Sequence, residues 1–171
     1  MYLVEKTYGQ NEGLSCVFRQ WRATFSHCRF LHGYALGVRL TFTANTLDAR
    51  NWVIDFGGFK AIRDYLHNKF DHKCLVAEDD PQRKLLELMA TANIMEVHIV
   101  PGTGCELFAS MIYDYVNKWL IDNTDSKKRH ESGLRLHSVQ VWEHEGNSAT
   151  YRPVQVFPPV AAYQIPNNPK D

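Results

Sequence analysis

The sequence predicts an α+β domain in which an antiparallel sheet carries its helices on one face. Residues 34–44 alternate between apolar and polar side chains, which is the pattern of a half-buried strand. A strand pair near each end of the chain encloses a central block of helical patterns, and this order is typical of α+β domains. A length of 171 residues suits one such domain with a single core.

The first strand pair is expected over residues 14–22 and 34–44, joined by a loop that is rich in cysteine and histidine. Residues 1–13 are expected to be a turn-rich segment that precedes the pair. Further along, apolar residues on one face predict a helix over residues 58–70. Asp55 is its expected N-cap, because the carboxylate can accept the free amides of the first turn.

A second helix is expected to start at residues 79–81, and residues 96–100 are expected to form a short strand. The longest helix follows Thr103, because Thr103 and Glu106 fit a capping box. Residues 123–133 are expected to be a charged loop. Residues 134–142 and 149–156 are expected to form the two strands of a closing hairpin.

Composition excludes several classes of protein. Lys and Arg total 19 and Asp and Glu total 19, so the balanced charge argues against nucleic acid as a partner. Apolar runs are broken by charges well before the ~20 residues that a membrane helix needs, so we expect no membrane partner. Without a signal-like N-terminus, and with four cysteines that lack CxxC spacing, the protein is expected to be cytoplasmic with reduced thiols.

The domain organisation is expected to be simple. Residues 1–157 form a single domain, and residues 158–171 form a Pro-rich, flexible C-terminal tail. No internal repeat and no second domain are visible in the sequence.

Reactive side chains concentrate in residues 26–34. Cys28 and His32 are four residues apart, His27 precedes the cysteine, and Tyr34 follows. A thiol, two imidazoles and a phenol supply nucleophile, base and metal-ligand chemistry. The alternative is a loop in which the cysteine is a small buried hydrophobe and the histidines are simply exposed.

Four segments resemble, in order, the family of 6-pyruvoyl-tetrahydropterin and 6-carboxytetrahydropterin synthases. Residues 28–34, Cys-Arg-Phe-Leu-His-Gly-Tyr, resemble its Cys-x-x-Leu-His-Gly-His segment, and residues 53–56 resemble the Asp-Phe segment that opens its first helix. Residues 70–75, Phe-Asp-His-Lys-Cys-Leu, resemble its Leu-Asp-His-x-x-Leu segment. Val141-Trp142-Glu143-His144 and the later Tyr151-Arg152 resemble its Lys-Glu-Thr strand and closing Tyr-Arg.

The resemblance implies the tunnelling fold (T-fold), in which ββααββ subunits join edge to edge into rings. Trimers usually stack into hexamers, with the sites between subunits, and dihydroneopterin triphosphate is the implied substrate. Ring closure would also cover the exposed hairpin edges that the sequence predicts. A homohexamer or another ring oligomer is therefore the expected partner arrangement.

The resemblance also implies roles for individual residues. Cys28 becomes a proton-shuttling thiolate, and Asp71 and His72 become the pair that poises it, since a carboxylate sets the tautomer and basicity of an imidazole. Glu143 would anchor the pterin by accepting two parallel hydrogen bonds from its amino-pyrimidinone edge. Glu106 and Arg29 are further candidates for substrate binding.

Each role has a plainer alternative. Asp71 could cap the end of a helix, with His72 facing solvent, and Glu143 could point to solvent from its strand. The capping box would be a sufficient explanation for Glu106.

The metal site departs from the family pattern. The family binds zinc through three histidines, and His32 is the one retained at a matching position, because Tyr34 replaces the second histidine of the Gly-His pair. The first strand offers Gln20 and Trp21 in place of the third, and His27 is a possible substitute. A catalytic zinc takes three protein ligands. Either zinc is held by an altered set that includes His27 and His32, or the protein lacks it.

The leading functional hypothesis is a 6-carboxytetrahydropterin synthase-like lyase of 7-deazapurine (queuosine precursor) biosynthesis. It would remove triphosphate and acetaldehyde from dihydroneopterin triphosphate. One alternative is the sister activity, which forms 6-pyruvoyltetrahydropterin. Two others are a non-catalytic pterin- or purine-binding protein of the same fold and a purely structural ring-forming protein.

Overall fold

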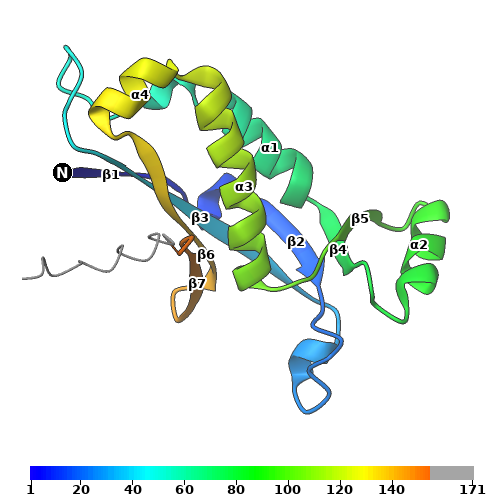
Figure 1. The fold of residues 1–171 in the computed structure, drawn as a ribbon. Coiled ribbons are helices and arrows are strands. Elements are labelled where there is room, and N and C mark those ends of the chain that lie inside the picture. The colour runs from blue at the N-terminus through cyan, green and yellow to red at the C-terminus, as the bar shows by residue number, and fades with distance from the viewer. Residues whose placement is uncertain (155–171) are drawn as a thin grey trace, which may run out of the picture.

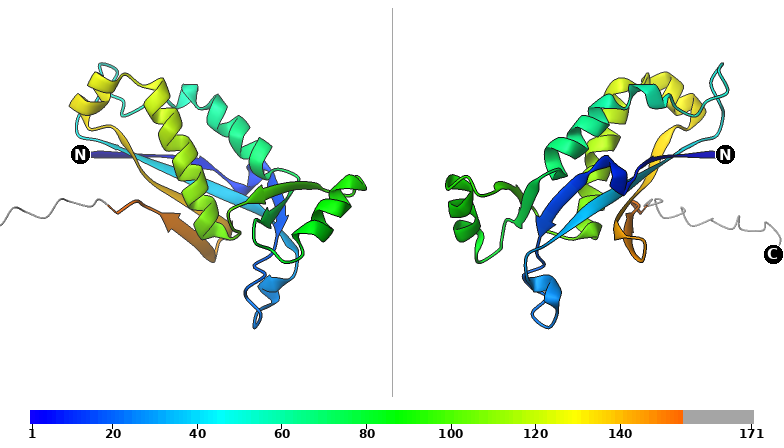
Figure 2. Two further views of the ribbon diagram at one scale, coloured as in Figure 1. Left: turned by 45° about the vertical axis from the view of Figure 1, so that its right-hand side comes forward. Right: turned by 180° about the vertical axis from the view of Figure 1, so that it is seen from behind.

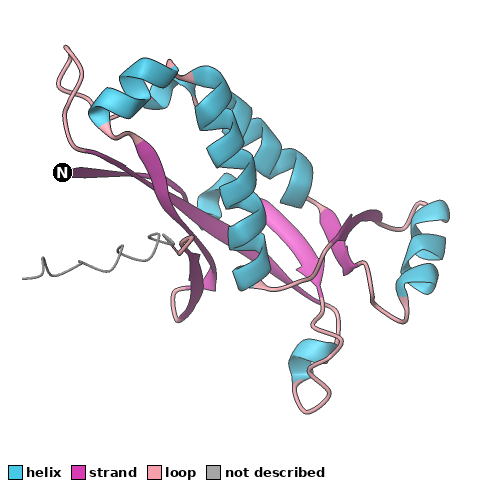
Figure 3. Cartoon of the chain, in the orientation of Figure 1, coloured by secondary structure: helices cyan, strands magenta, loops and turns pink. Residues whose placement is uncertain are grey.

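The computed structural model describes residues 1–154, which form seven strands and four α-helices (Figures 1 and 3). The segment 158–171, expected to be a flexible tail, lies outside the described residues, as do the last residues of the expected closing strand. The strands are β1 Tyr2–Tyr8, β2 Leu14–Phe18, β3 His32–Ala44, β4 Lys73–Ala77, β5 Glu96–Val100, β6 Arg135–His144 and β7 Asn147–Tyr151. The helices are α1 Lys60–Phe70, α2 Arg83–Thr91, α3 Cys105–Asn123 and α4 Ser126–Ser132.

The long strand β3 is the centre of the sheet. Its first half pairs with β2 and its second half with β1, both antiparallel, and its other edge pairs with β6. Beyond β2 the sheet continues through β4 and β5, and beyond β6 it ends at β7. The expected hairpins β2–β3 and β6–β7 are therefore confirmed.

The sheet is mixed, where the sequence predicted an antiparallel one. The pairs β2–β4 and β4–β5 are parallel. Helix α2 is a crossover connection, which returns the chain to start β5 in the direction of β4. Strand β4 is parallel to β2 because the chain reverses twice between them, once at the β2–β3 hairpin and once through α1. Strand β4 itself was not expected, since its apolar run directly follows the Asp71-His72 pair.

The helices α1 and α3 lie together across one face of the sheet, as expected (Figure 1). They meet through stacked Tyr65 and Tyr115 rings, whose centroids are 3.6 Å apart. Beneath them, Phe18, Phe42 and Phe108 belong to the main core and are fully buried. Helix α2 and the strands β4 and β5 enclose a smaller cluster at the far end of the sheet (Figure 2).

Two further elements differ from the expectation. Residues 2–8, expected to be part of a turn-rich segment, form the edge strand β1, which keeps most of its side chains exposed and therefore shows little apolar alternation. Residues 126–132, expected to be loop, form α4. Asp125 caps this helix by accepting the Lys128 amide, and Gly133 ends it in a left-handed conformation.

Candidate functional site

A cavity of about 380 Å³ brings together four of the residues that the sequence singled out, Cys28, His32, Glu106 and Glu143. They come from the β2–β3 loop, the start of β3, the start of α3 and the end of β6. The other lining residues are Phe18, Gln20, Cys105, Gly146, Asn147, Ser148 and Ala149. The catalytic and binding roles of the four residues stay predictions, but their meeting at one place is a property of the fold.

Cys28 is held in place by its own backbone. It lies in a short 3₁₀ turn, where its amide donates to Ser26 Oγ (3.2 Å) and its carbonyl accepts from the Gln20 amide (2.8 Å). This second bond ties the two sides of the loop together, directly beyond the end of β2. These two hydrogen bonds therefore fix the backbone of Cys28 and hold its thiol at the cavity.

Cys28 is also the accessible thiol of the protein. All four cysteines are free, and Cys16, Cys74 and Cys105 are buried whereas Cys28 is half-buried. Burial, with smaller contributions from neighbouring charges, raises the pKa of Cys16 and of Cys105 to about 12, so both stay protonated at neutral pH. Since the thiolate is the reactive form of cysteine, Cys28 is the candidate for thiol chemistry.

A bulge in the β6–β7 hairpin aims Glu143 at the cavity. Trp142 pairs with Ser148 and His144 with Asn147, so Glu143 is the extra residue of the bulge. Bulges often redirect a side chain next to a functional site. The backbone carbonyl of Glu143 accepts a hydrogen bond from Gln10 Nε2 (2.8 Å), which fixes this corner from the opposite end of the chain.

Cys105 and Gln20 complete the cavity, and the sequence reasoning did not assign either of them a role. Burial, the charges of Glu143 and Glu106 and a hydrogen bond to Glu143 hold the Cys105 thiol in its protonated form. Gly104 has a φ of +115°, and a Cβ there would lie 2.5 Å from Gln20 Nε2. Only glycine allows the Gln20 amide to approach so closely.

The expected capping box at α3 is wrong. Gly104 is the N-cap and provides no side-chain cap, while the Thr103 hydroxyl donates to the Arg19 carbonyl (2.6 Å). Glu106 is consequently not needed for capping, and its exposed side chain lines the cavity. The start of α3 also presents first-turn amides without a side-chain partner, which favours acceptor groups nearby.

An ion pair with a buried carboxylate connects the base of the β2–β3 loop, which carries Cys28, to the β4–α2 connection. Arg19 Nε donates to Asp80 Oδ2 (2.8 Å), and a second guanidinium nitrogen contacts Oδ1. The Asp80 side chain is 1% exposed and also accepts the Gln82 amide. The hydrogen bonds from Arg19 outweigh burial and hold the pKa of Asp80 below its ordinary value. Through Thr103, the same arginine is joined to the residue that precedes the α3 N-cap.

Asp71 and His72 form the expected pair but do not line the cavity. Asp71 Oδ1 lies 2.7 Å from His72 Nδ1. Although burial opposes it, hydrogen bonds from His72 and His67 lower the pKa of Asp71. The His72 amide donates to the Ser15 carbonyl, which places the pair beside β2 about three residues, or roughly 10 Å, before the Phe18 end. His72 has a φ of +56°, and its side chain is 86% exposed.

Arg29 and His27 are also away from the cavity. Arg29 donates to the Thr24 carbonyl (3.2 Å), and its guanidinium lies 4.7 Å from the centroid of the Phe30 ring. His27 is exposed on the same turn. Within one copy of the chain, neither residue contacts the space in which a ligand would lie.

The residues of one copy do not fit a catalytic zinc. His32 Nδ1 lies 2.6 Å from the Phe30 carbonyl, which leaves Nε2 as its one nitrogen for a metal. No group of three His, Cys, Asp or Glu side chains in residues 1–154 is placed to hold a metal ion. Three protein ligands are what a catalytic zinc takes. Zinc at His32 and His27 therefore stays a prediction of the family resemblance.

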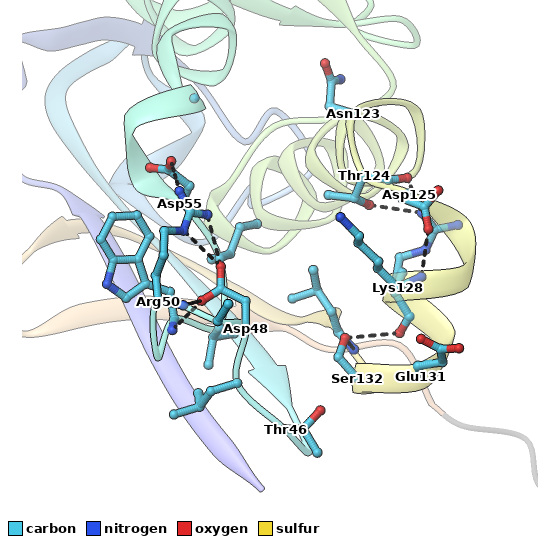
Figure 4. Close-up of a pocket in the computed structure, with 18 of the residues that line it drawn as sticks. Thr46, Asp48, Arg50, Asp55, Asn123, Thr124, Asp125, Lys128, Glu131 and Ser132 are labelled. Atoms are coloured by element: carbon cyan, nitrogen blue, oxygen red, sulfur yellow. Dashed lines mark hydrogen bonds and ion pairs between the residues drawn. The ribbon is translucent and has the colours of Figure 1, made fainter.

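A larger hollow, of about 980 Å³, lies between residues 46–58 and the α3–α4 junction (Figure 4). None of the residues predicted to be functional lines it. Several of its charges are used within the chain: Arg50 pairs with Asp48 and Asp55, and Asp125 caps α4. The smaller cavity is therefore the candidate site.

Fold and cavity together are those of a tunnelling-fold protein, and comparison with known proteins names the family. The family model for 6-pyruvoyl tetrahydropterin synthase matches residues 9–154. The chain therefore belongs to this family of pterin-processing enzymes. None of the helices in residues 1–154 is both long and apolar enough to cross a membrane.

Individual relatives are distant. A 6-carboxy-5,6,7,8-tetrahydropterin synthase of Aquifex aeolicus is 26% identical over 133 residues, which cover 73% of this chain and 75% of the relative. A solved structure of an uncharacterized protein of Wolinella succinogenes has a TM-score of 0.70 at 17% identity, covering 88% and 97% of the two chains. The 6-pyruvoyl tetrahydropterin synthase of Plasmodium falciparum has a TM-score of 0.58 at 18% identity, covering 90% and 99%. At these identities the structures support the fold alone.

The buried pair predicts a pH-dependent effect of Asp80→Asn. We expect the variant to lower the free energy of unfolding by about 3 kcal/mol at pH 7, because the partly buried Arg19 loses its counter-charge. Since the folded-state pKa of Asp80 is depressed, its contribution is present above the unfolded value near pH 4 and is lost as the pH falls through the folded value. The difference between variant and natural protein should therefore shrink below about pH 4 in denaturant unfolding.

The matched control is Asp79→Asn. Asp79 pairs with Arg22 at the surface, where its side chain is 44% exposed. Such a pair contributes less than about 1 kcal/mol. Equal losses for the two variants would contradict the assignment of Asp80 as the fastening residue.

Proposed function

We propose that this protein is a 6-carboxytetrahydropterin synthase-like lyase, which converts dihydroneopterin triphosphate in 7-deazapurine (queuosine precursor) biosynthesis. The observation that carries the proposal is the single cavity that joins the accessible thiol of Cys28 to the carboxylate of Glu143. The named Aquifex relative supports this member of the family over its 6-pyruvoyl sister. The family model, which is named for the 6-pyruvoyl activity, supports the sister activity as the alternative. A non-catalytic pterin- or purine-binding protein is the second alternative.

The cavity suits the head group of a pterin. Its volume of about 380 Å³ falls within the ~300–1,000 Å³ typical of small-molecule sites. Glu143 is acceptor-only when ionised and can receive two parallel N–H bonds from the amino-pyrimidinone edge. The protonated thiol of Cys105 lines the same cavity as this carboxylate. Gln20 offers both an amide donor and an acceptor at the side of the ring.

The thiol of Cys28 moves the proton in this proposal. Its partners are Asp71 and His72, which one copy of the chain holds at its surface, away from its own cavity. The hydrogen bond that His72 Nδ1 donates to Asp71 fixes the His72 ring, and the exposed imidazole is available to the cavity of a neighbouring copy. No step of the proposal passes through zinc.

A ring of copies is supported by the two outer strands of the sheet. Within the described residues β1 pairs with β3 alone and β7 with β6 alone, so each has one free edge. Three successive antiparallel pairings make β7 run opposite to β1. The β7 edge of one copy can therefore extend the sheet of the next at β1 in antiparallel register, which closes a ring. A homohexamer with sites between subunits is the proposed assembly.

Turnover tests the proposal directly. Purified protein incubated with dihydroneopterin triphosphate is expected to release triphosphate and acetaldehyde and to form a carboxylated tetrahydropterin, identified by mass spectrometry. Cys28→Ala should lower the rate by at least about 100-fold, because the proton carrier is lost. Because no complete zinc set is present in one copy, we expect added zinc or a chelator to leave the rate within about twofold.

Intact substrate under all of these conditions would contradict the lyase and favour the non-catalytic binding protein. A 6-pyruvoyl product would assign the sister activity. A rate that a chelator abolishes and zinc restores would show that ligands from neighbouring copies complete a metal site.

Glu143→Gln tests the anchoring carboxylate. We expect the affinity for a pterin, measured by calorimetry, to fall by at least about tenfold, because a neutral amide cannot accept both N–H bonds. Glu145→Gln is the control, since Glu145 is exposed in the adjacent turn and does not line the cavity. Equal affinities for the two variants would contradict the anchoring role.

A further inference from the structure

An apolar groove lies beside the first residues of β1, apart from the candidate site. Its volume is about 460 Å³, and its walls are residues 2–4, 47 and 51–57 of the chain. Three exposed aromatic side chains line it, with exposed fractions of 49% for Tyr2, 46% for Trp52 and 36% for Phe56. Leu3 is 51% exposed beside them. We call this surface the β1 groove. Large aromatic side chains gathered at a surface mark a binding site.

The aromatic wall of the groove is formed in advance. The Asp48 carboxylate accepts hydrogen bonds from the amides of Arg50 and Trp52, and it also binds the Arg50 side chain. The Arg50 guanidinium lies 4.2 Å from the Trp52 ring centroid and reaches Asp55 at 3.3 Å. Figure 4 shows Arg50 between these two carboxylates. The network holds Trp52 without help from a ligand, which lowers the entropy cost of binding.

The chain carries a segment whose chemistry matches this groove. Residues 155–171 contain four prolines, at 158, 159, 166 and 169, with Phe157, Tyr163 and Ile165 among them. Lys170 and Asp171 are its charged residues. Pro-rich segments favour the polyproline II conformation and bind to grooves lined by aromatic side chains.

The register of the sheet directs this segment toward the groove. Four paired residues mark one level across the sheet. From β7 to β1 they are Tyr151, Val139, Leu40 and Lys6. Strand β7 runs in the same direction as β3, whose last residue lies opposite Tyr2. The chain therefore leaves Val154 toward the end of the sheet where the β1 groove opens.

The distance to the groove is short for such a segment. Between β7 and β1 the sheet is three strand spacings wide, roughly 14 Å. A polyproline II segment spans about 3.1 Å per residue, so about five residues cover that width. The route does not require a ring of copies.

We propose that residues 155–171 dock in the β1 groove. The prolines and aromatic side chains of the segment cover Tyr2, Trp52 and Phe56. This docking is independent of the proposed reaction, because the groove shares no residue with the cavity of Cys28 and Glu143.

Limited proteolysis of the full chain tests the docking. Chymotrypsin is added, and cleavage after Tyr163 is followed by mass spectrometry. Cleavage after Phe25, which is 94% exposed on the β2–β3 loop, serves as the internal reference. We expect Trp52→Ala to speed cleavage at Tyr163 at least tenfold relative to Phe25. Tyr2→Ala is expected to act in the same direction, and it keeps the test valid if Trp52→Ala unfolds.

The control is Ile94→Ala, because Ile94 is 67% exposed at the opposite end of the molecule, after α2. It should leave the ratio of the two cleavages unchanged. Equal ratios in all variants would overturn the proposal. An unchanged ratio together with a smaller particle for Trp52→Ala in size-exclusion chromatography would also overturn it, since the groove would then be covered by the folded part of a neighbouring copy.

Discussion

The register of the central strand β3 is the constraint on which the rest of the structure depends. Its thirteen residues pair with three other strands, and its second half is almost wholly buried. At its middle, Gly37 lies opposite Trp142, and a Cβ on this glycine would be 2.0 Å from the indole ring. A side chain there would therefore displace the ring or the strand, and a slip of one residue would turn every side chain of β3 to the other face.

The candidate site follows from this register. On one edge of β3, Phe18 lies opposite His32, which sets the position of the loop that carries Cys28. On the other edge, Trp142 lies opposite Gly37, which sets the position of the bulge that carries Glu143. The Arg19–Asp80 pair and the Thr103 hydrogen bond then bring the start of α3 against both. The cavity is thus assembled from segments that are far apart in the sequence.

Local patterns made part of this predictable. The alternation of β3, the two hairpins, the α1 face and the spacing of Cys28 and His32 can each be recognised within a few residues. The edge strand β1 could not be, because its exposed side chains carry no alternation. The mixed sheet was missed because parallel pairing depends on how a crossover helix returns the chain.

Contacts between distant segments explain why the site differs from the sequence prediction at several residues. Thr103 suits a capping box locally, but the Arg19 carbonyl, 84 residues earlier, takes its hydroxyl. Cys105 is recognised as part of the site only because the fold places it in the same cavity as Glu143. Asp71 and His72 were correctly expected to pair, yet no sequence pattern indicates that they lie outside the cavity of their own copy. The helix α4 was hidden by its charge, although its Asp125 and Gly133 caps are visible in the sequence.

In the proposed assembly, one copy supplies the cavity with its thiol and the next copy supplies the acid–base pair. Complementation between two inactive variants tests it most directly. Cys28→Ala and His72→Ala proteins are co-expressed with different tags, and mixed oligomers are purified and assayed with dihydroneopterin triphosphate. If the site is shared, about a quarter of the sites in a random mixture hold both natural residues, and activity returns to a corresponding level. Mixed oligomers as inactive as their parents would show that the site is not shared between copies.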